Sequence, residues 1–224
     1  QSAAIDARTS RDGTTRSRSQ WLRLPTSMYS MKRTMTPVPR PLHHFLPQRA
    51  VLTQIIPESA DTRTFVLRLE APLVAFETAR PGQFAMLSVR GHGEAAFSLS
   101  DLPSTGAAKG TVVLTVRRVG ALTSALFELE LGASVGVRGP FGHGWPMEKL
   151  TGREVVIVSG GIGLAPLRPV IYWLLRHRAQ YRRVVLLYGC RTPEDQLYSQ
   201  ELADWSSHRA IDVLVTVDNA TSGW

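Results

Sequence analysis

Three closely spaced glycines form the clearest candidate binding site in this sequence. Gly160, Gly161 and Gly163 follow a short β-branched run, residues 155–158, and a helical pattern of apolar residues begins directly after them. A strand, a glycine turn and a helix N-terminus can together bind a pyrophosphate, because the missing side chains let a phosphate reach the backbone and the helix end supplies free N–H groups. The alternative is a tight turn without a ligand, since Pro166 stands where the G-x-G-x-x-G fingerprint has its third glycine.

The region around this turn, residues 151–224, alternates strand and helix patterns, which predicts a parallel sheet. Its apolar runs are typical of strands covered on both faces. Asp195 and Tyr198 are expected in the first turns of the second helix. Because three strands are few for such a sheet, we expect the domain to be incomplete at its carboxyl end. The predicted elements are strands at 155–158, 184–188 and 211–217 and helices at 165–178 and 194–205.

Residues 49–150 have the alternating apolar pattern of short strands separated by Gly and Pro turns. Six strands and one short helix, 123–130, predict a closed antiparallel barrel, which leaves no exposed sheet edge. The predicted strands are 50–56, 62–69, 83–90, 96–100, 111–118 and 134–138.

The basic charge of the chain is concentrated near its N-terminus. Residues 1–49 hold nine Arg or Lys and two Asp, which gives a net charge of +7. Residues 50–224 hold seventeen Arg or Lys and sixteen Asp or Glu, which gives a net charge of +1. A nucleic-acid interface needs a basic face on the folded part, so we expect no nucleic-acid partner; binding through the tail alone stays an alternative. Residues 1–36 are predicted to be a disordered leader, belonging to a fragment or an over-extended gene product rather than a transit peptide, and residues 37–48 a Pro-rich lead-in.

Cysteine and histidine usage excludes several kinds of site. Cys190 is the only cysteine, so the sequence has neither an internal disulfide nor a cysteine cluster, and its histidines show no ligand spacing; we expect no metal site. Cys190 itself is expected to be packed and inert rather than catalytic. No apolar run approaches the roughly 18 residues of a membrane span, and a reducing cytoplasm is the expected location.

Six motifs in order make the chain similar to the ferredoxin–NADP reductase superfamily. The resemblance implies that the barrel binds FAD and that the second domain binds NAD(P)H. Hydride would then pass between the two cofactors, with the protein supplying position and electrostatics. The motifs are PGQF (81–84), AFSLS (96–100), VGALT (119–123), GPFG (139–142), SGGIGLAPL (159–167) and YGCRTPEDQLY (188–198).

The resemblance also assigns site residues. Ser98 is the catalytic candidate, because its hydroxyl can hydrogen-bond the flavin nitrogen that accepts hydride. Arg191 could accept the 2′-phosphate of NADP, or could simply pair with Glu194 or Asp195. Trp145 could cover a flavin edge or fill the seam between the domains. The expected cofactor-binding residues are Phe97, Ser98 and Leu99 beside the flavin ring, Gly120 and Thr123 at the flavin diphosphate, and Gly160, Gly161, Gly163, Pro166 and Arg191 at the nicotinamide nucleotide.

One departure narrows the resemblance. The family usually has an arginine two residues before the aromatic, where it binds the flavin phosphate, and here that position is Ala95. One branch of the family also lacks this arginine, and the chain resembles that branch. It contains the gamma subunits of cytoplasmic nickel–iron hydrogenases and sulfhydrogenases, anaerobic sulfite reductase subunits, and dihydroorotate dehydrogenase electron-transfer subunits. This branch implies an iron–sulfur partner subunit, and a [2Fe–2S] cluster only if a further carboxyl-terminal segment carries it. A stand-alone ferredoxin or oxygenase reductase and a non-redox scaffold are the alternatives.

Overall fold

A computed structural model describes residues 46–71, 73–207 and 210–220 of the chain. The predicted leader, 1–36, and most of the lead-in, 37–48, lie outside the described residues. In the described part, no helix has both the length and the apolar character needed to cross a membrane.

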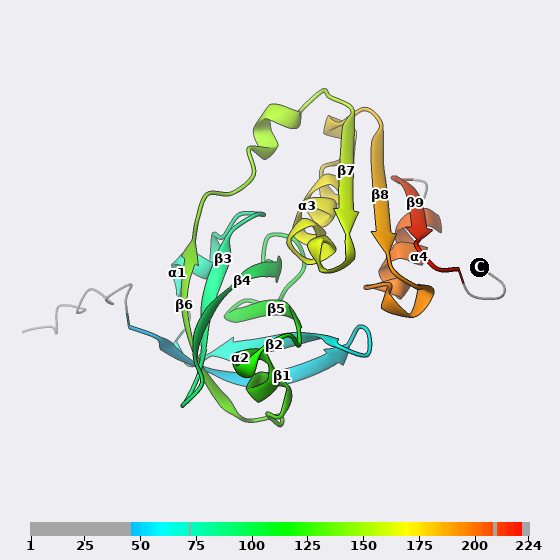
Figure 1. Cartoon of the computed structure of the whole chain (residues 1–224). Coiled ribbons are helices and arrows are strands. Elements are labelled where there is room, and N and C mark those ends of the chain that lie inside the picture. The colour runs from blue at the N-terminus through cyan, green and yellow to red at the C-terminus, as the bar shows by residue number, and fades with distance from the viewer. Residues whose placement is uncertain (1–45, 72, 208–209, 221–224) are drawn as a thin grey trace, which may run out of the picture. The chain divides into compact units, whose positions relative to one another are not determined.

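The first half of the described chain folds into the predicted closed barrel of six antiparallel strands, which is confirmed (Figure 1). Strand alternation explains the core: Phe65 and Leu67 point inward and pair with Leu114 and Val112 on the neighbouring strand, and all four side chains are buried. The order around the barrel is β1-β2-β5-β4-β3-β6. The strands are β1 (Gln48–Pro57), β2 (Thr62–Leu69), β3 (Phe84–Val89), β4 (Gly93–Asp101), β5 (Thr111–Arg117) and β6 (Ser134–Phe141).

Two short helices accompany the barrel, and a third connects it to the second domain, whose core contains Met147. They are α1 (Val74–Glu77), α2 (Ala121–Phe127) and the 3₁₀ helix η1 (Met147–Leu150). The prediction of a helix at 123–130 was wrong at both ends: α2 begins at Ala121, with Gly120 as its N-cap, and ends at Phe127, so that Thr123 is the third helical residue.

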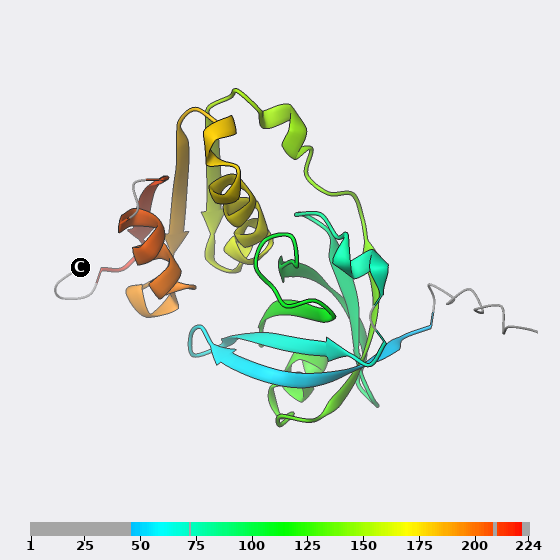
Figure 2. The ribbon, with the colours of Figure 1, turned by 180° about the vertical axis from the view of Figure 1, so that it is seen from behind.

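The second half forms a three-stranded parallel sheet in the order β7-β8-β9, as predicted. Helices α3 and α4 lie on the same face of this sheet, as the view from behind shows (Figure 2). The elements are β7 (Val155–Gly160), η2 (Gly161–Gly163), α3 (Leu164–Arg176), η3 (Arg178–Gln180), β8 (Val184–Cys190), η4 (Pro193–Asp195), α4 (Ser199–Ser207) and β9 (Asp212–Val217).

The expectation that these strands are covered on both faces was wrong for the described residues. Val156 and Val158 on β7 are 61% and 69% exposed, and Leu214 on β9 is 51% exposed. The reason is topological. Right-handed crossovers that advance in one direction across a sheet place every helix on the same face, and the order β7-β8-β9 never reverses.

The predicted helix 194–205 was also wrong in its first part. Residues 193–195 form a 3₁₀ turn, α4 begins only at Ser199, and Tyr198 between them has a positive φ of 53°. Asp195 and Tyr198 therefore precede α4 instead of belonging to its first turns.

Gly82, in the predicted PGQF motif, allows the ring of Trp145 to pack against the barrel. Its φ is +98°, and an added Cβ would lie 2.6 Å from Trp145 Cδ1 and 3.2 Å from the Trp145 backbone nitrogen. We expect Gly82→Ala to lower the free energy of unfolding by about 3 kcal/mol, from left-handed backbone strain plus overpacking. Gly91→Ala is the control, because Gly91 has a φ of +80° with open space around it, and it should cost only about 1 kcal/mol. Equal losses in urea titrations would show that the contact with Trp145 is unimportant.

Candidate functional site

A pocket of about 330 Å³ opens at the carboxyl edge of the parallel sheet, where ligands of such sheets bind. Three glycines in its lining, which we call the glycine floor, are Gly160, the last residue of β7, Gly161, which follows it, and Gly189, one residue before the end of β8. Ser59 and Asp61, in the hairpin between β1 and β2, also line the pocket. The pocket therefore lies where the barrel meets the α/β domain.

The glycines of the floor leave room for a ligand to approach the backbone. A Cβ built on Gly160, Gly161 or Gly189 would meet nothing within 4 Å, and Gly161 has a φ of +50°. This open backbone is suited to bind the pyrophosphate that the glycine turn predicts. Gly163 is different: it has a helical φ of −61°, a Cβ on it would touch the Ser159 hydroxyl at 3.5 Å, and it does not line the pocket.

Pro166, the fourth predicted member of this loop, is the third residue of α3 and is also outside the pocket lining. A proline in the first turn of a helix removes no helical hydrogen bond, because the N–H groups there have no partner within the helix. The structure therefore divides the loop into two parts: Gly160 and Gly161 face the pocket, whereas Gly163 and Pro166 build the helix that begins behind it.

Two arginines line the pocket, and each has an aspartate partner. Arg191 makes two hydrogen bonds of 3.0 Å to the carboxylate of Asp195, and Arg117 makes one of 2.7 Å to Asp61. Asp218 at the end of β9 adds a third acid. Of the two roles that the sequence left open for Arg191, the structure contains the pairing with Asp195. The five side chains together carry a net charge of −1, two cations against three anions.

Cys190 also borders the pocket, but its thiol is suited to packing. The side chain is buried and its Sγ lies 3.3 Å from the carbonyl of Thr192. Burial, followed by the charges of Asp195 and Asp218, raises the pKa of the thiol. A raised pKa disfavours the reactive thiolate, in agreement with the expected inert role.

The predicted flavin residues lie on β4, in the barrel. Phe97 is partly buried against the barrel core, and Ser98, the next residue along, points to the other face of the strand. No hydrogen bond joins the Ser98 hydroxyl to another residue of the described chain. Leu99 is 2% exposed and its N–H donates to the Gln83 carbonyl at 3.0 Å, so neither its side chain nor its amide is available to a ligand.

Gly120 and Thr123 come together at the start of α2. The Thr123 hydroxyl accepts hydrogen bonds from the N–H groups of Gly120 at 2.9 Å and Val119 at 3.0 Å, and it lies 3.0 Å from the Gly120 carbonyl that it donates to. A hydroxyl has one proton and two lone pairs, so the local turn uses all of its capacity. A Cβ on Gly120 would meet nothing within 4 Å, which leaves the backbone open to a phosphate.

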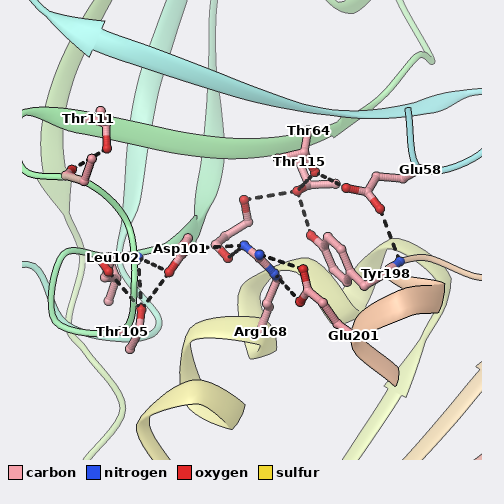
Figure 3. A network of polar contacts seen from close by, with 12 residues as sticks. Glu58, Thr64, Asp101, Leu102, Thr105, Thr111, Thr115, Arg168, Tyr198 and Glu201 are labelled. Carbon is pink, nitrogen blue, oxygen red and sulfur yellow. Dashed lines mark hydrogen bonds and ion pairs between the residues drawn. The ribbon is translucent and has the colours of Figure 1, made fainter. Parts of the chain in front are cut away.

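A buried polar network that the sequence did not predict crosses the seam between the two domains (Figure 3). The Tyr198 hydroxyl donates to Thr115 Oγ1 at 2.6 Å, and Thr115 is hydrogen-bonded in turn to Thr64 at 2.7 Å. The Thr64 hydroxyl donates to Glu58 at 2.6 Å, and the other oxygen of Glu58 accepts the Tyr198 N–H at 3.2 Å. A second branch of this network contains Arg168.

Glu58 makes this network dependent on pH. Its burial raises the pKa of the carboxyl above 4.5, although hydrogen bonds from Thr64 and Tyr198 oppose the shift. As the pH rises, the unfolded chain therefore loses this proton at a lower pH than the folded protein does. The folded protein should lose stability as the pH rises from 4.5 through the raised pKa. We expect Glu58→Gln to gain stability relative to the wild type across this window, as urea midpoints between pH 4 and 8 would show. A difference that does not change with pH would contradict this assignment.

Sequence reasoning missed much of the pocket wall for two reasons. Gly189 and Asp218 could have been found from the rule that ligands bind at the carboxyl ends of parallel strands, because the strand predictions already placed them there. Asp61 and Arg117 belong to the barrel, and their proximity to the glycine turn depends on how the two domains pack. No local pattern reports that packing.

Comparison with known protein families assigns the barrel and the α/β domain to two different families. Residues 49–145 match the family described as oxidoreductase FAD-binding domain, and residues 157–224 match the oxidoreductase NAD-binding domain. Among solved structures, the cytochrome P450 reductase GcoB of Amycolatopsis is similar, with a TM-score of 0.66 and 27% identity over 79% of this chain and 53% of that one.

Curated relatives come from the predicted branch. The gamma subunit of sulfhydrogenase 2 from Pyrococcus furiosus is 35% identical over 58% of this chain and 44% of its own length. A probable dihydroorotate dehydrogenase B electron transfer subunit from Methanocella arvoryzae is 33% identical over 79% of this chain and 59% of its own length. The chain thus spans about half the length of the curated relatives that it matches.

Proposed function

The chain carries the FAD-binding and NAD-binding oxidoreductase domains of the ferredoxin reductase superfamily, and we propose that it is an electron-transfer subunit that moves electrons between NAD(P)H and a metal-cluster partner. The observation that carries the proposal is the open glycine floor of the pocket, at the seam between the two domains. FAD supplies the chemistry, because a flavin can accept a hydride and release electrons singly.

The residues of the chain act by binding and orientation. Gly160, Gly161 and Gly189 offer backbone to the pyrophosphate of the nicotinamide nucleotide, next to the start of α3. On the barrel, Gly120 offers backbone to the flavin diphosphate and Ser98 offers a free hydroxyl beside the flavin ring. Phe97, which points to the opposite face of β4, is proposed to contact the same ring through the part of its side chain that the barrel core leaves exposed. Position 95, where the family's phosphate-binding arginine is replaced by alanine, should make FAD binding weaker than in relatives that keep it.

The partner is proposed to be an iron–sulfur subunit of a hydrogenase-like complex. The similarity to two sulfhydrogenase gamma subunits of Pyrococcus furiosus, at 35% and 33% identity, favours this partner. A second candidate partner is a dihydroorotate dehydrogenase-like flavoenzyme in place of the hydrogenase. The similarity to dihydroorotate dehydrogenase electron transfer subunits favours this candidate. We also propose that the protein acts in the cytoplasm, because the branch that it resembles includes subunits of cytoplasmic hydrogenases.

NADH is proposed as the better nucleotide, despite the arginine that first suggested NADP. Arg191 is already held by Asp195 through two hydrogen bonds, and the pocket wall carries three acids against two arginines. A 2′-phosphate would bring about two further negative charges to this wall, and its excess of acids would repel them.

The experiment is anaerobic absorbance of the FAD-reconstituted chain, titrated separately with NADH and NADPH. Bleaching of the flavin band is expected with both, at a lower concentration of NADH. Bound flavin that neither nucleotide bleaches would refute hydride transfer by this chain alone, and a folded chain that binds no flavin would support the scaffold alternative. Rapid turnover with free ferredoxin, without any partner subunit, would instead favour a stand-alone reductase.

A further inference from the structure

Arg168 is a largely buried arginine that joins the α/β domain to β4, the strand of the barrel that is proposed to contact the flavin. It is the fifth residue of α3, the helix that begins directly after the glycine turn. Its Nη1 donates to the Ser100 carbonyl on β4 at 3.0 Å and lies 3.5 Å from the Asp101 carboxylate. Its Nε and Nη2 donate to the two carboxylate oxygens of Glu201 on α4, at 2.7 and 2.8 Å (Figure 3).

The surroundings fix the guanidinium in one orientation. Its side chain is 13% exposed, and the rings of Tyr172 and Tyr198 lie 5.2 and 5.0 Å from its central carbon. Burial alone would lower the pKa of Arg168, but the hydrogen bonds and charge of Glu201, together with Asp101, raise it above its ordinary value. The group therefore stays charged, and its planar fork sets both direction and distance.

These contacts connect the two places where cofactors are proposed to bind. Ser100 is two residues after Ser98 on the same strand, and Arg168 is seven residues after Gly161 on the helix that follows the glycine turn. A shift of α3 relative to β4 would separate the two sites, and a displacement of about 1 Å in reacting groups can cost a hundredfold in rate.

We propose that Arg168 is a positioning residue for hydride transfer: by linking β4, α3 and α4, it sets the distance between the flavin ring and the nicotinamide ring. This inference rests on the proposed function, because it needs both cofactors in their proposed places. Lysine cannot replace the arginine here, since a single ammonium group cannot form the two parallel bonds to Glu201 while it also reaches Ser100.

The test is Arg168→Lys in the full chain, followed by stopped-flow reduction of the bound flavin with NADH. We expect the limiting rate of reduction to fall at least tenfold while the apparent Kd for NADH changes less than threefold. Arg183→Lys is the matched control, because Arg183 makes a comparable pair with Asp212, at 2.7 Å, on the exposed surface of the same sheet. The control should reduce its flavin at the wild-type rate.

Hydrogen–deuterium exchange without nucleotide gives a readout independent of activity. Amides at 99–102 and 200–205 should exchange at least tenfold faster in Arg168→Lys than in Arg183→Lys. A wild-type reduction rate in Arg168→Lys, or a slow rate with unchanged exchange in both segments, would overturn the proposal. Glu201→Gln weakens the same link with less disturbance and should show smaller changes in the same direction, so it decides the matter if the lysine variant does not fold. A wild-type chain that NADH does not reduce would refute the proposed function instead.

Discussion

Gly161→Val should abolish reduction by NADH at ordinary concentrations while leaving FAD bound to the barrel. Gly161 has a φ of +50°, in the left-handed region that β-branched residues avoid, and its missing Cβ faces open space in the pocket. Valine would strain the turn by about 1–2 kcal/mol and would place its methyl groups where the pyrophosphate is proposed to lie. We expect the apparent Kd for NADH to rise more than a hundredfold, or about 2.7 kcal/mol.

A neighbouring glycine provides the control for this prediction. Gly163→Ala changes the same loop, but Gly163 has a helical φ of −61°, lies outside the pocket lining, and has ordinary van der Waals space for a Cβ at 3.5 Å from Ser159. Titration of flavin bleaching with NADH should give a Kd within twofold of the wild type. If both variants lost affinity equally, the loop would act through its overall shape and not through open backbone at Gly161.

The sequence predicted the barrel well because its strands are amphipathic. In β2, Phe65, Leu67 and Leu69 are buried while the intervening Val66 and Arg68 are more exposed, which is the period of a strand with one buried face, and the strand was predicted at 62–69 as observed. Burial in the sheet of the second domain could not be predicted in the same way. Val156 and Val158 are β-branched whether a helix covers them or not, and their exposure depends on the order of the strands.

The candidate site was predictable only where a local backbone requirement marks it. Gly161 needs a positive φ and an open approach, which glycine alone supplies, so the turn was visible in the sequence. Tyr198 also has a positive φ, but its residue type gives no such signal, and its bond to Thr115 joins positions 83 residues apart. The same is true of Arg168 and Ser100, which are 68 residues apart. Contacts of this kind depend on tertiary packing, which sequence periodicity does not encode.

Ser98→Ala should slow hydride transfer about a hundredfold without loss of FAD. The Ser98 hydroxyl makes no hydrogen bond to another described residue, and it lies on the strand whose end Arg168 holds in place. It is therefore free to donate a hydrogen bond to the flavin nitrogen that would accept the hydride, and this bond would polarise that nitrogen towards the incoming hydride. Removing one such preorganised donor typically costs a hundredfold or more in rate.

Two further variants separate this role of Ser98 from a general loss of packing. Ser98→Thr keeps a hydroxyl and should recover part of the rate, whereas Ser88→Ala removes a hydroxyl from the neighbouring strand β3 and should reduce its flavin normally. Stopped-flow reduction with saturating NADH measures all three. Because Ser98 is proposed to act on the flavin nitrogen and not on nucleotide binding, the apparent Kd for NADH should stay within threefold of the wild type in each. A full rate in Ser98→Ala would mean that the hydroxyl does not face the flavin, and a flavin site along β4 would then have to use backbone groups alone.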